Sequence, residues 1–225
     1  MIHILYRHTE NASGIGKQRP VGFSYEKCLN NILNTIDGNE NIKFHLLYDG
    51  TCKIVDKRIH HIINFSGGSD KESFFFTWHY AKKISLGERD LVYFLENDYF
   101  HVDNWYDKVI DIYNTFDVPG YVSLYDHRDK YTLAMYNDLL SQVYVTNTSH
   151  WRTVPSTCGS FIVSKKILDE DYDVHTSFYS DHDKFVYLGN TRNRIIITPL
   201  PGLSTHCDDL FMSPLINWDN VISNS

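Results

Sequence analysis

Short apolar runs alternate with stretches of helical periodicity in the first half of the chain. The apolar runs are typical of β-strands, and they lie at residues 1–7, 42–48, 59–65, 91–95 and 121–125. Stretches with a period of about 3.6 residues predict helices at residues 25–36, 69–84 and 104–116. Ser24 and Ser69 stand at the starts of the first two helices as N-caps. This alternation of strand and helix predicts a mostly parallel sheet with helices on its faces.

The second half of the chain is less regular, and its predicted elements are shorter. Its strand-like runs lie at residues 143–146, 159–163 and 194–198. Residues 181–188 predict a helix, and residues 8–23, polar and rich in glycine, predict a loop. The chain has no internal repeat and no low-complexity linker, so we expect a single α/β domain over residues 1–225.

The composition narrows the class of protein. The 225 residues are 42% hydrophobic and 15% aromatic, which excludes a disordered or coiled-coil chain. No apolar run approaches the roughly 20 residues that a membrane span needs, and the N-terminal run lacks the charged segment of a secretory signal. We therefore expect a protein of the cytoplasm, or of a membrane surface reached from it.

Charge and cysteine usage exclude two further classes. The formal net charge is −7, which argues against a protein whose main role is to follow a nucleic-acid backbone, though not against one local basic site. The four cysteines lie far apart and form no Cys-x-x-Cys motif. They predict reduced thiols rather than a disulfide scaffold or a zinc cage.

Two acidic residues directly follow the most apolar strand. Residues 91–95 are continuously apolar, which is typical of a strand covered on both faces, and Glu96 and Asp98 come next. Alternation along an extended chain places these two side chains on the same side, at the strand end where ligands bind in open α/β sheets. Two neighbouring carboxylates favour a cation such as Mg²⁺ or Mn²⁺. The alternative is that Asp98 caps a turn and Glu96 lies in solvent.

This signature resembles that of a known family. A parallel-sheet domain whose fourth strand ends in an acidic-x-acidic motif is similar to the nucleotide-sugar domain of GT-A-fold glycosyltransferases, whose Asp-x-Asp motif holds a divalent metal on the diphosphate. Here the motif reads Glu96-Asn97-Asp98, and residues 103–105 open the next helix as in that fold. The resemblance extends from residue 1 to about residue 203. Residues 125–127, 150–152 and 201–206 also resemble small glycosyltransferase-like proteins of phages and bacterial polysaccharide clusters.

The resemblance implies an activity and a metal site. It implies a GT-A-like domain that transfers a sugar from a nucleotide-sugar donor, a UDP-sugar first, to a hydroxyl acceptor with Mn²⁺ or Mg²⁺. Asp98 and His206 would be metal ligands, together with Glu96, which could instead contact ribose or a metal-bound water. Asp181 takes the position of the catalytic base of inverting members. Residues 1–125 would then bind the nucleotide sugar, and residues 126–225 the acceptor.

Three further residues are candidate contacts of the nucleotide sugar. The resemblance places Asp49 against the nucleotide base, while Arg7 ends the first strand and could face the nucleotide. Arg152 could contact the phosphates of the leaving group, because they need cationic donors besides the metal. Asp49, Asp181 and Arg152 each have a structural alternative. Asp49 could only form an Asp-Gly turn, Asp181 could only favour a helix N-terminus, and Arg152 could belong to a mixed-charge surface loop.

Other functions remain open at this stage. A divalent-metal nucleotidyltransferase or hydrolase could use the same acidic loop, although the glycines and the basic residues Lys17 and Arg19 after the first strand are loosely spaced. A non-catalytic nucleotide-sugar-binding module is a third possibility. The acceptor could be a saccharide, a lipid-linked sugar or a modified DNA base. For DNA, a basic rim would be expected from Lys17, Arg19, Arg128, Lys130 and Arg152.

Overall fold

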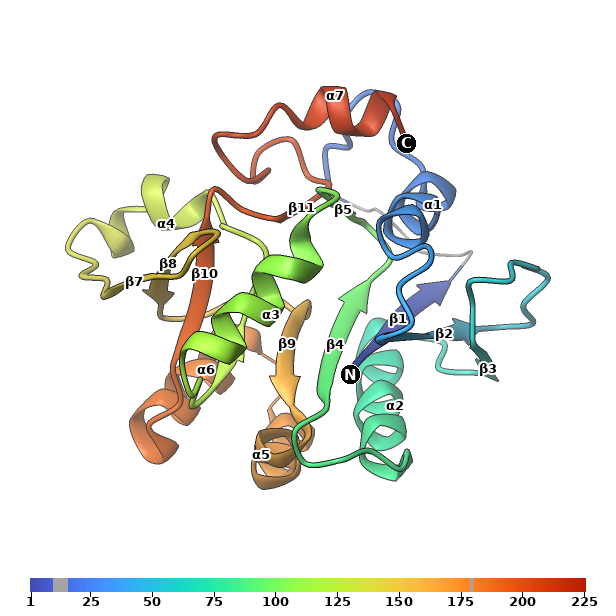
Figure 1. Cartoon of the computed structure of the whole chain (residues 1–225), viewed down its shortest axis with the longest axis horizontal. Coiled ribbons are helices and arrows are strands. Elements are labelled where there is room, and N and C mark those ends of the chain that lie inside the picture. The colour runs from blue at the N-terminus through green and yellow to red at the C-terminus, as the bar shows by residue number, and fades with distance from the viewer. Residues whose placement is uncertain (10–15, 179) are drawn as a thin grey trace.

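The computed structural model describes residues 1–9, 16–178 and 180–225 (Figure 1). Within these ranges the main sheet has nine strands in the order β3-β2-β1-β4-β9-β6-β10-β8-β7. In chain order the strands are β1 (Ile2–Thr9), β2 (Ile42–Asp49), β3 (His61–Phe65), β4 (Leu91–Glu96), β6 (Tyr121–Val122), β7 (Val143–Val145), β8 (His150–Val154), β9 (Phe161–Ser164) and β10 (Ile196–Leu200). A separate antiparallel ribbon consists of β5 (Tyr99–His101) and β11 (Ser204–His206).

The parallel part of the sheet is the block β3-β2-β1-β4, in which each strand runs parallel to its neighbour. Strand β9 then lies antiparallel between β4 and β6, and β10 returns to the direction of β6. The sheet is therefore mixed, with a parallel core. This confirms the predicted α/β class, in which helices flank the parallel core of the sheet.

Helices cover both faces of the sheet (Figure 1). They are α1 (Tyr25–Thr35), α2 (Asp70–Lys83), α3 (Trp105–Thr115), α5 (Lys165–Ser177) and α6 (Asp181–Arg192), with the short α4 (Asp129–Thr132), a 3₁₀ turn at Ala134–Tyr136, and α7 (Trp218–Ser223) near the C-terminus. Apolar residues of α1 and α3 pack on one face, whereas those of α2, α5 and α6 pack on the other. Strand β1 serves both layers, because Ile4 and Leu5 alternate between the two clusters.

Local signals in the sequence account for the well-predicted helices. The Ser24 hydroxyl accepts a hydrogen bond from the Lys27 amide at the start of α1, and Ser69 accepts one from the Glu72 amide at the start of α2. Each cap satisfies a backbone N–H that lacks a partner within its helix. The predicted strand at residues 91–95 is β4, whose first five residues are buried, as expected for a strand covered on both faces.

Several elements differ from the sequence prediction, and two of them, β8 and α5, carry the largest differences; the short β5, β11, α4 and α7 were not predicted either. Residues 150–152, expected in a loop, belong to β8, which pairs with β10 and β7. Helix α5 was not predicted, because polar residues occupy part of its buried face. Asp171 and His175 are fully buried there, and each bonds the hydroxyl of Tyr121. The Asp171 carboxylate also pairs with Arg192 and Arg194. Partners distant in sequence thus make a polar face suitable for burial.

Across residues 1–9, 16–178 and 180–225, the helices are all too short or too polar to cross a lipid bilayer.

Candidate active site

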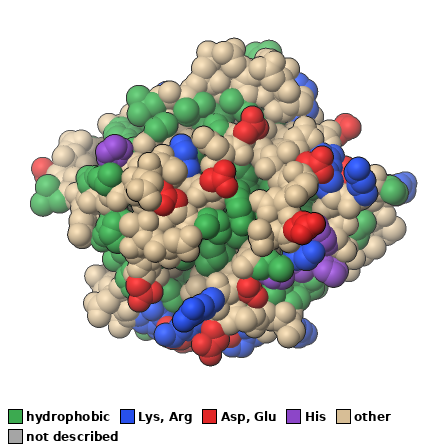
Figure 2. Space-filling view, viewed as in Figure 1, with side chains coloured by type: hydrophobic (Ala, Val, Ile, Leu, Met, Phe, Trp, Pro, Cys, Tyr) green, Lys and Arg blue, Asp and Glu red, His purple; other side chains and the backbone are tan. Residues whose placement is uncertain are grey.

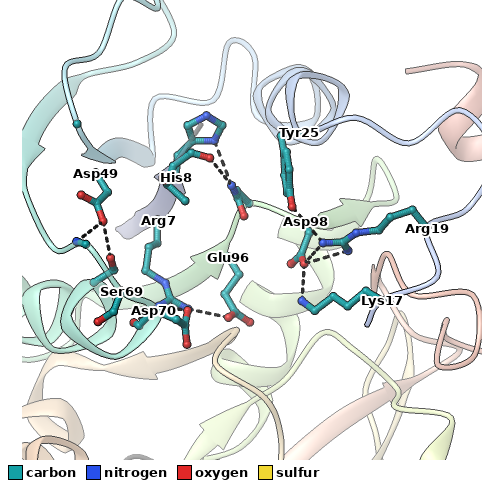
Figure 3. A pocket seen from close by; sticks show the side chains of 15 residues that line it. Arg7, His8, Lys17, Arg19, Tyr25, Asp49, Ser69, Asp70, Glu96 and Asp98 are labelled. Atoms are coloured by element: carbon teal, nitrogen blue, oxygen red, sulfur yellow. Dashed lines mark hydrogen bonds and ion pairs between the residues drawn. The ribbon is translucent and has the colours of Figure 1, made fainter. Parts of the chain in front are cut away.

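A cleft of about 620 Å³ opens at the carboxyl ends of β1, β2 and β4 (Figure 3). Residues from these strand ends, from the loop before α1 and from the start of α2 line it. Strand β1 lies between β2 and β4; the connection from β1 to β2 crosses one face of the sheet through α1, whereas the connection from β3 to β4 crosses the other face through α2. Such a switch point is where ligands bind in open α/β sheets. The cleft is therefore the candidate active site.

Arg7 of β1 joins the two sides of the cleft. Its guanidinium donates to the Asp70 carboxylate at 2.7 Å and to the Glu96 carboxylate at 2.7 Å. Burial raises the pKa of Glu96 above its ordinary range; the charge of Arg7 opposes this, and the charges of Asp98 and Asp181 add to it. Arg7 thus lies in the cleft as expected, but its donors hold two protein carboxylates, and it keeps Glu96 turned toward β1 and α2.

Asp98 lies at the centre of a group of cationic and polar side chains (Figure 3). Its Oδ2 atom is 3.0 Å from His206 Nε2, 2.8 Å from Lys17 Nζ and 3.1 Å from the Arg19 guanidinium. The Asp98 side chain is only 6% exposed. Burial raises the pKa of its carboxyl, but the contacts with His206 and Lys17 outweigh burial, and this pKa falls well below its ordinary range. Asp98 is therefore an anion in the folded protein.

The ribbon of β5 and β11 brings His206 to Asp98. Its antiparallel register pairs His206 with Tyr99, the residue after Asp98. The Cys207 amide then donates a hydrogen bond to the Asp98 carbonyl at 2.9 Å, which fixes the two chain segments against each other. Two residues that are 108 positions apart thus lie in direct contact.

Asp98, His206, Lys17 and Arg19 form the corner discussed from here on, and its ligand atoms suit a hard divalent cation in part. The Asp98 oxygen and the His206 nitrogen are 3.0 Å apart and are the ligand types that Mn²⁺ and Mg²⁺ accept. Glu96 belongs to the Arg7 ion pair, and no group of three His, Cys, Asp or Glu side chains suited to a metal occurs in the described parts of the chain. Two protein ligands fit an ion that takes its remaining ligands from substrate phosphates and water. The binding of Mn²⁺ or Mg²⁺ thus stays a prediction, with Asp98 and His206 as the protein ligands.

Asp49 lines the cleft, but its carboxylate already holds the loop between β3 and α2. It accepts hydrogen bonds from the Gly67 and Gly68 amides and from the Ser73 hydroxyl at 2.9, 3.1 and 2.9 Å. These bonds fix the first turn of α2 against the end of β2. The predicted contact between Asp49 and a nucleotide base would have to use the carboxylate positions that these three donors leave open.

Asp181 begins α6 beside the acidic end of β4. Its Oδ1 atom accepts from Lys184 Nζ at 2.8 Å, and its side chain is 35% exposed. The Lys184 side chain is fully buried and lies over the rings of Phe74 and Phe185. Asp181 is absent from the lining of the 620 Å³ cleft, yet its charge acts on Glu96 and on Cys158. It thus lies within electrostatic range of Glu96, partly exposed and outside the lining of the cleft.

Arg152 lies away from the cleft. Its guanidinium donates to the fully buried Asp126 at 2.9 Å and lies over the Tyr131 ring. Lys130 likewise pairs with Asp129, and its side chain is 3% exposed. The expected basic rim therefore does not form, because Lys130 and Arg152 are largely buried against neighbouring carboxylates. On the face in Figure 2, basic and acidic side chains are interspersed.

Lys17 and Arg19 also line the cleft, although the sequence placed them only in a loosely spaced basic loop. Besides Asp98, Arg19 donates to the Cys207 carbonyl and to the Tyr25 hydroxyl. The signal in the sequence was a glycine-containing loop with two basic residues directly after the first strand. Gly14, which belongs to this loop signal, lies outside the described residues.

No protein-family model matches the chain, and no curated protein matches it. Solved structures do match the path of its backbone. One is the 2-C-methyl-D-erythritol 4-phosphate cytidylyltransferase of Francisella tularensis, with 14% identity, coverage of 99% of this chain and 98% of that chain, and a TM-score of 0.48. Another is the 4-diphosphocytidyl-2C-methyl-D-erythritolsynthase of Anaerococcus prevotii, with 13% identity, coverage of 99% and 94%, and a TM-score of 0.48. At this level of similarity neither structure assigns an activity to this chain.

Proposed function

We propose that the chain is a transferase that binds the diphosphate portion of a nucleotide substrate in the cleft at the ends of β1, β2 and β4. The observation that carries this proposal is the contact of Asp98 with His206, beside the cationic side chains of Lys17 and Arg19. A phosphate group needs cationic donors, and a carboxylate with an imidazole can hold a divalent ion against it. Arg7 borders the same space.

The charges of the cleft favour a substrate that brings a cation with it. Of the described residues that line it, four carry carboxylates and three carry a basic group of the Lys or Arg type. A diphosphate adds further negative charge, which would repel Asp98 and Glu96 at close range. A divalent ion bound with the nucleotide would neutralise this charge and stabilise the charge that develops on a departing phosphate.

We propose sugar transfer from a nucleotide-sugar donor to a hydroxyl acceptor as the reaction. Asp181 supports it, because a partly exposed carboxylate within electrostatic range of Glu96 can accept the proton of an attacking hydroxyl. The acceptor oxygen would form a bond to C1 of the sugar while the bond from C1 to the diphosphate breaks. The proton would pass to Asp181, and Lys17 and Arg19 would stabilise the negative charge of the departing nucleoside diphosphate. Attack opposite the leaving group inverts the configuration at C1.

Nucleotidyl transfer is the second candidate, and a specific observation favours it. Nucleotidyltransferases usually bring a glycine-rich loop with Lys or Arg directly after their first strand, and here Lys17 and Arg19 reach the cleft from that loop. In this reaction an acceptor oxygen attacks the α-phosphate of a nucleoside triphosphate, and pyrophosphate leaves. Both candidates use the same cleft, but they release different products.

The released product tests the two reactions. The purified protein is incubated with Mn²⁺ and either UDP-, GDP-, CMP- and TDP-sugars or the four nucleoside triphosphates, and each product is measured by chromatography. Sugar transfer, to an added saccharide or slowly to water, releases the free nucleotide from one sugar donor. Nucleotidyl transfer, to an added sugar phosphate or slowly to water, releases pyrophosphate from one triphosphate. Nucleotide binding without either product would favour a non-catalytic module, and the absence of binding to any of these compounds would contradict the proposed function.

Two variants separate binding from chemistry. Asp98→Asn should weaken Mn²⁺-dependent nucleotide binding, because it removes the buried charge at the centre of the corner. Asp181→Asn should keep that binding and lower turnover by about a hundredfold or more, the range for loss of a general base. Asp183→Asn is the matched control, because Asp183 is an exposed carboxylate in the same helix turn. An Asp181→Asn variant with full turnover would remove this residue as the base.

A further inference from the structure

The Lys17 ammonium lies between the two protein atoms suited to a divalent cation. Lys17 Nζ is 2.8 Å from Asp98 Oδ2 and 2.9 Å from His206 Nε2, and these two acceptor atoms are 3.0 Å from each other. The three atoms therefore form a nearly equilateral triangle with the ammonium at one corner. An ammonium is a compact point charge that donates to several acceptors at once.

The contacts of His206 Nε2 set its role at this corner. With a proton on Nε2, the imidazole would donate to Asp98 but would face the Lys17 ammonium donor to donor at 2.9 Å. With its proton on Nδ1, the imidazole accepts from the Lys17 ammonium instead, and Nε2 and Asp98 Oδ2 are then two acceptors 3.0 Å apart, a contact that becomes favourable through the cation they share. In that arrangement both atoms face one positive charge, as ligands face a metal ion.

We infer that Lys17 holds the cation position of the nucleotide-free protein, and that a divalent ion binds Asp98 and His206 only by displacing the Lys17 ammonium. The inference rests on the proposed function, because the displacing ligand is a divalent ion bound to a nucleoside diphosphate. Lys17 is free to make the exchange, because its side chain is 39% exposed, whereas that of Asp98 is 6% exposed. The displaced ammonium then turns to the phosphates that arrive with the ion.

Arg19 keeps the corner intact during this exchange. Its guanidinium contacts Asp98 Oδ2 through both terminal nitrogens at 3.1 Å, and it also donates to the Cys207 carbonyl. It lies over the ring of Phe23, and its side chain is 18% exposed. These contacts tie Arg19 to the protein on several sides, whereas the Lys17 ammonium has two hydrogen-bond partners within the described parts of the chain, Asp98 and His206. Lys17 is therefore the exchangeable cation.

Titration with Mn²⁺ alone tests the exchange without any nucleotide. Free Mn²⁺ is followed by electron paramagnetic resonance in the wild-type protein, in Lys17→Met and in Lys27→Met. Lys27 is the matched control, because it is a lysine of the neighbouring α1 that donates to the Ile222 carbonyl outside the corner. We expect Lys17→Met to bind Mn²⁺ at least tenfold more tightly than the wild type and Lys27→Met, and the double variant Lys17→Met/Asp98→Asn to lose this binding.

Nucleotide binding gives the second readout. In the presence of Mn²⁺, Lys17→Met should bind the nucleoside diphosphate about tenfold more weakly than the wild type does, because the variant has no ammonium group to contact the phosphates. The opposite signs of the two effects separate the exchange from structural damage, which would weaken both, and circular dichroism checks the fold of each variant. Equal or weaker Mn²⁺ affinity in folded Lys17→Met would overturn the inference. Tighter Mn²⁺ binding without any nucleotide binding would leave the inference standing and contradict the proposed function.

Discussion

Acid should destabilise the protein through His45, a buried histidine at the centre of the β2 strand. Its Nε2 atom is 3.1 Å from His3 Nδ1, and its Nδ1 atom is 2.9 Å from the Tyr80 hydroxyl of α2. The His45 residue is 4% exposed, and its ring stacks on that of His61. Burial, and to a smaller extent the charges of the neighbouring histidines His61, His3 and His60, lower the pKa of His45 to about 3. The folded protein therefore holds a neutral His45.

The sign and size of the effect follow from proton linkage. The pKa of a histidine in the unfolded chain is about 6.5, so below that pH the unfolded state binds a proton that folded His45 does not bind. The stabilising contribution is complete above pH of about 6.5 and is lost as the pH falls toward about 3. Each pH unit in this window changes the free energy of unfolding by about 1.4 kcal/mol, so between about pH 8 and about pH 5 the loss from His45 is about 2 kcal/mol.

Urea unfolding followed by tryptophan fluorescence at about pH 8 and about pH 5 measures this loss. In His45→Gln the decrease in unfolding free energy between the two pH values should be about 2 kcal/mol smaller than in the wild type. Phe44→Leu is the matched control, because it disturbs the packing of the same strand without removing a titratable group, and it should keep the wild-type pH dependence. An unchanged pH dependence in His45→Gln would refute the assignment of acid sensitivity to this histidine.

Three further predictions concern backbone contact, capping and the cleft. Gly120→Ala would place a Cβ atom 1.9 Å from the Ile195 carbonyl oxygen, so we expect a loss of several kcal/mol, above the roughly 3 kcal/mol usual for overpacking, seen as a large fall in melting temperature; a near wild-type melting temperature would contradict the contact. Ser24→Ala removes the cap of α1 and should lower the unfolding free energy by about 1 kcal/mol in urea titration, whereas Ser24→Asp, which can also cap, should restore it. Arg7→Met should release Glu96 from its ion pair and lower nucleotide affinity by about tenfold, which is the size of one lost charge-assisted bond. Arg58→Met breaks the ion pair with Asp56, away from the cleft, and should leave nucleotide affinity unchanged in calorimetry.

Much of the parallel part of the fold could be predicted because its signals are local. The apolar runs of β1, β2 and β4 and the caps Ser24 and Ser69 act within a few residues of the chain. The position of Glu96 and Asp98 at the end of a buried strand followed from the same pattern. The second half was less predictable, because its elements depend on distant partners. Helix α5 buries Asp171 only because Arg192 and Arg194 lie against it.

The sequence by itself thus determined the α/β class, the central strand and the acidic residues at its end, because periodicity and capping depend on neighbouring residues. Tertiary structure decided which charges meet. Strand order and register placed His206 and Lys17 on Asp98, turned Glu96 toward Arg7, and gave Arg152 to Asp126 rather than to the cleft. These pairings join residues far apart in the chain, and their geometry exists only after the sheet and the β5–β11 ribbon have formed.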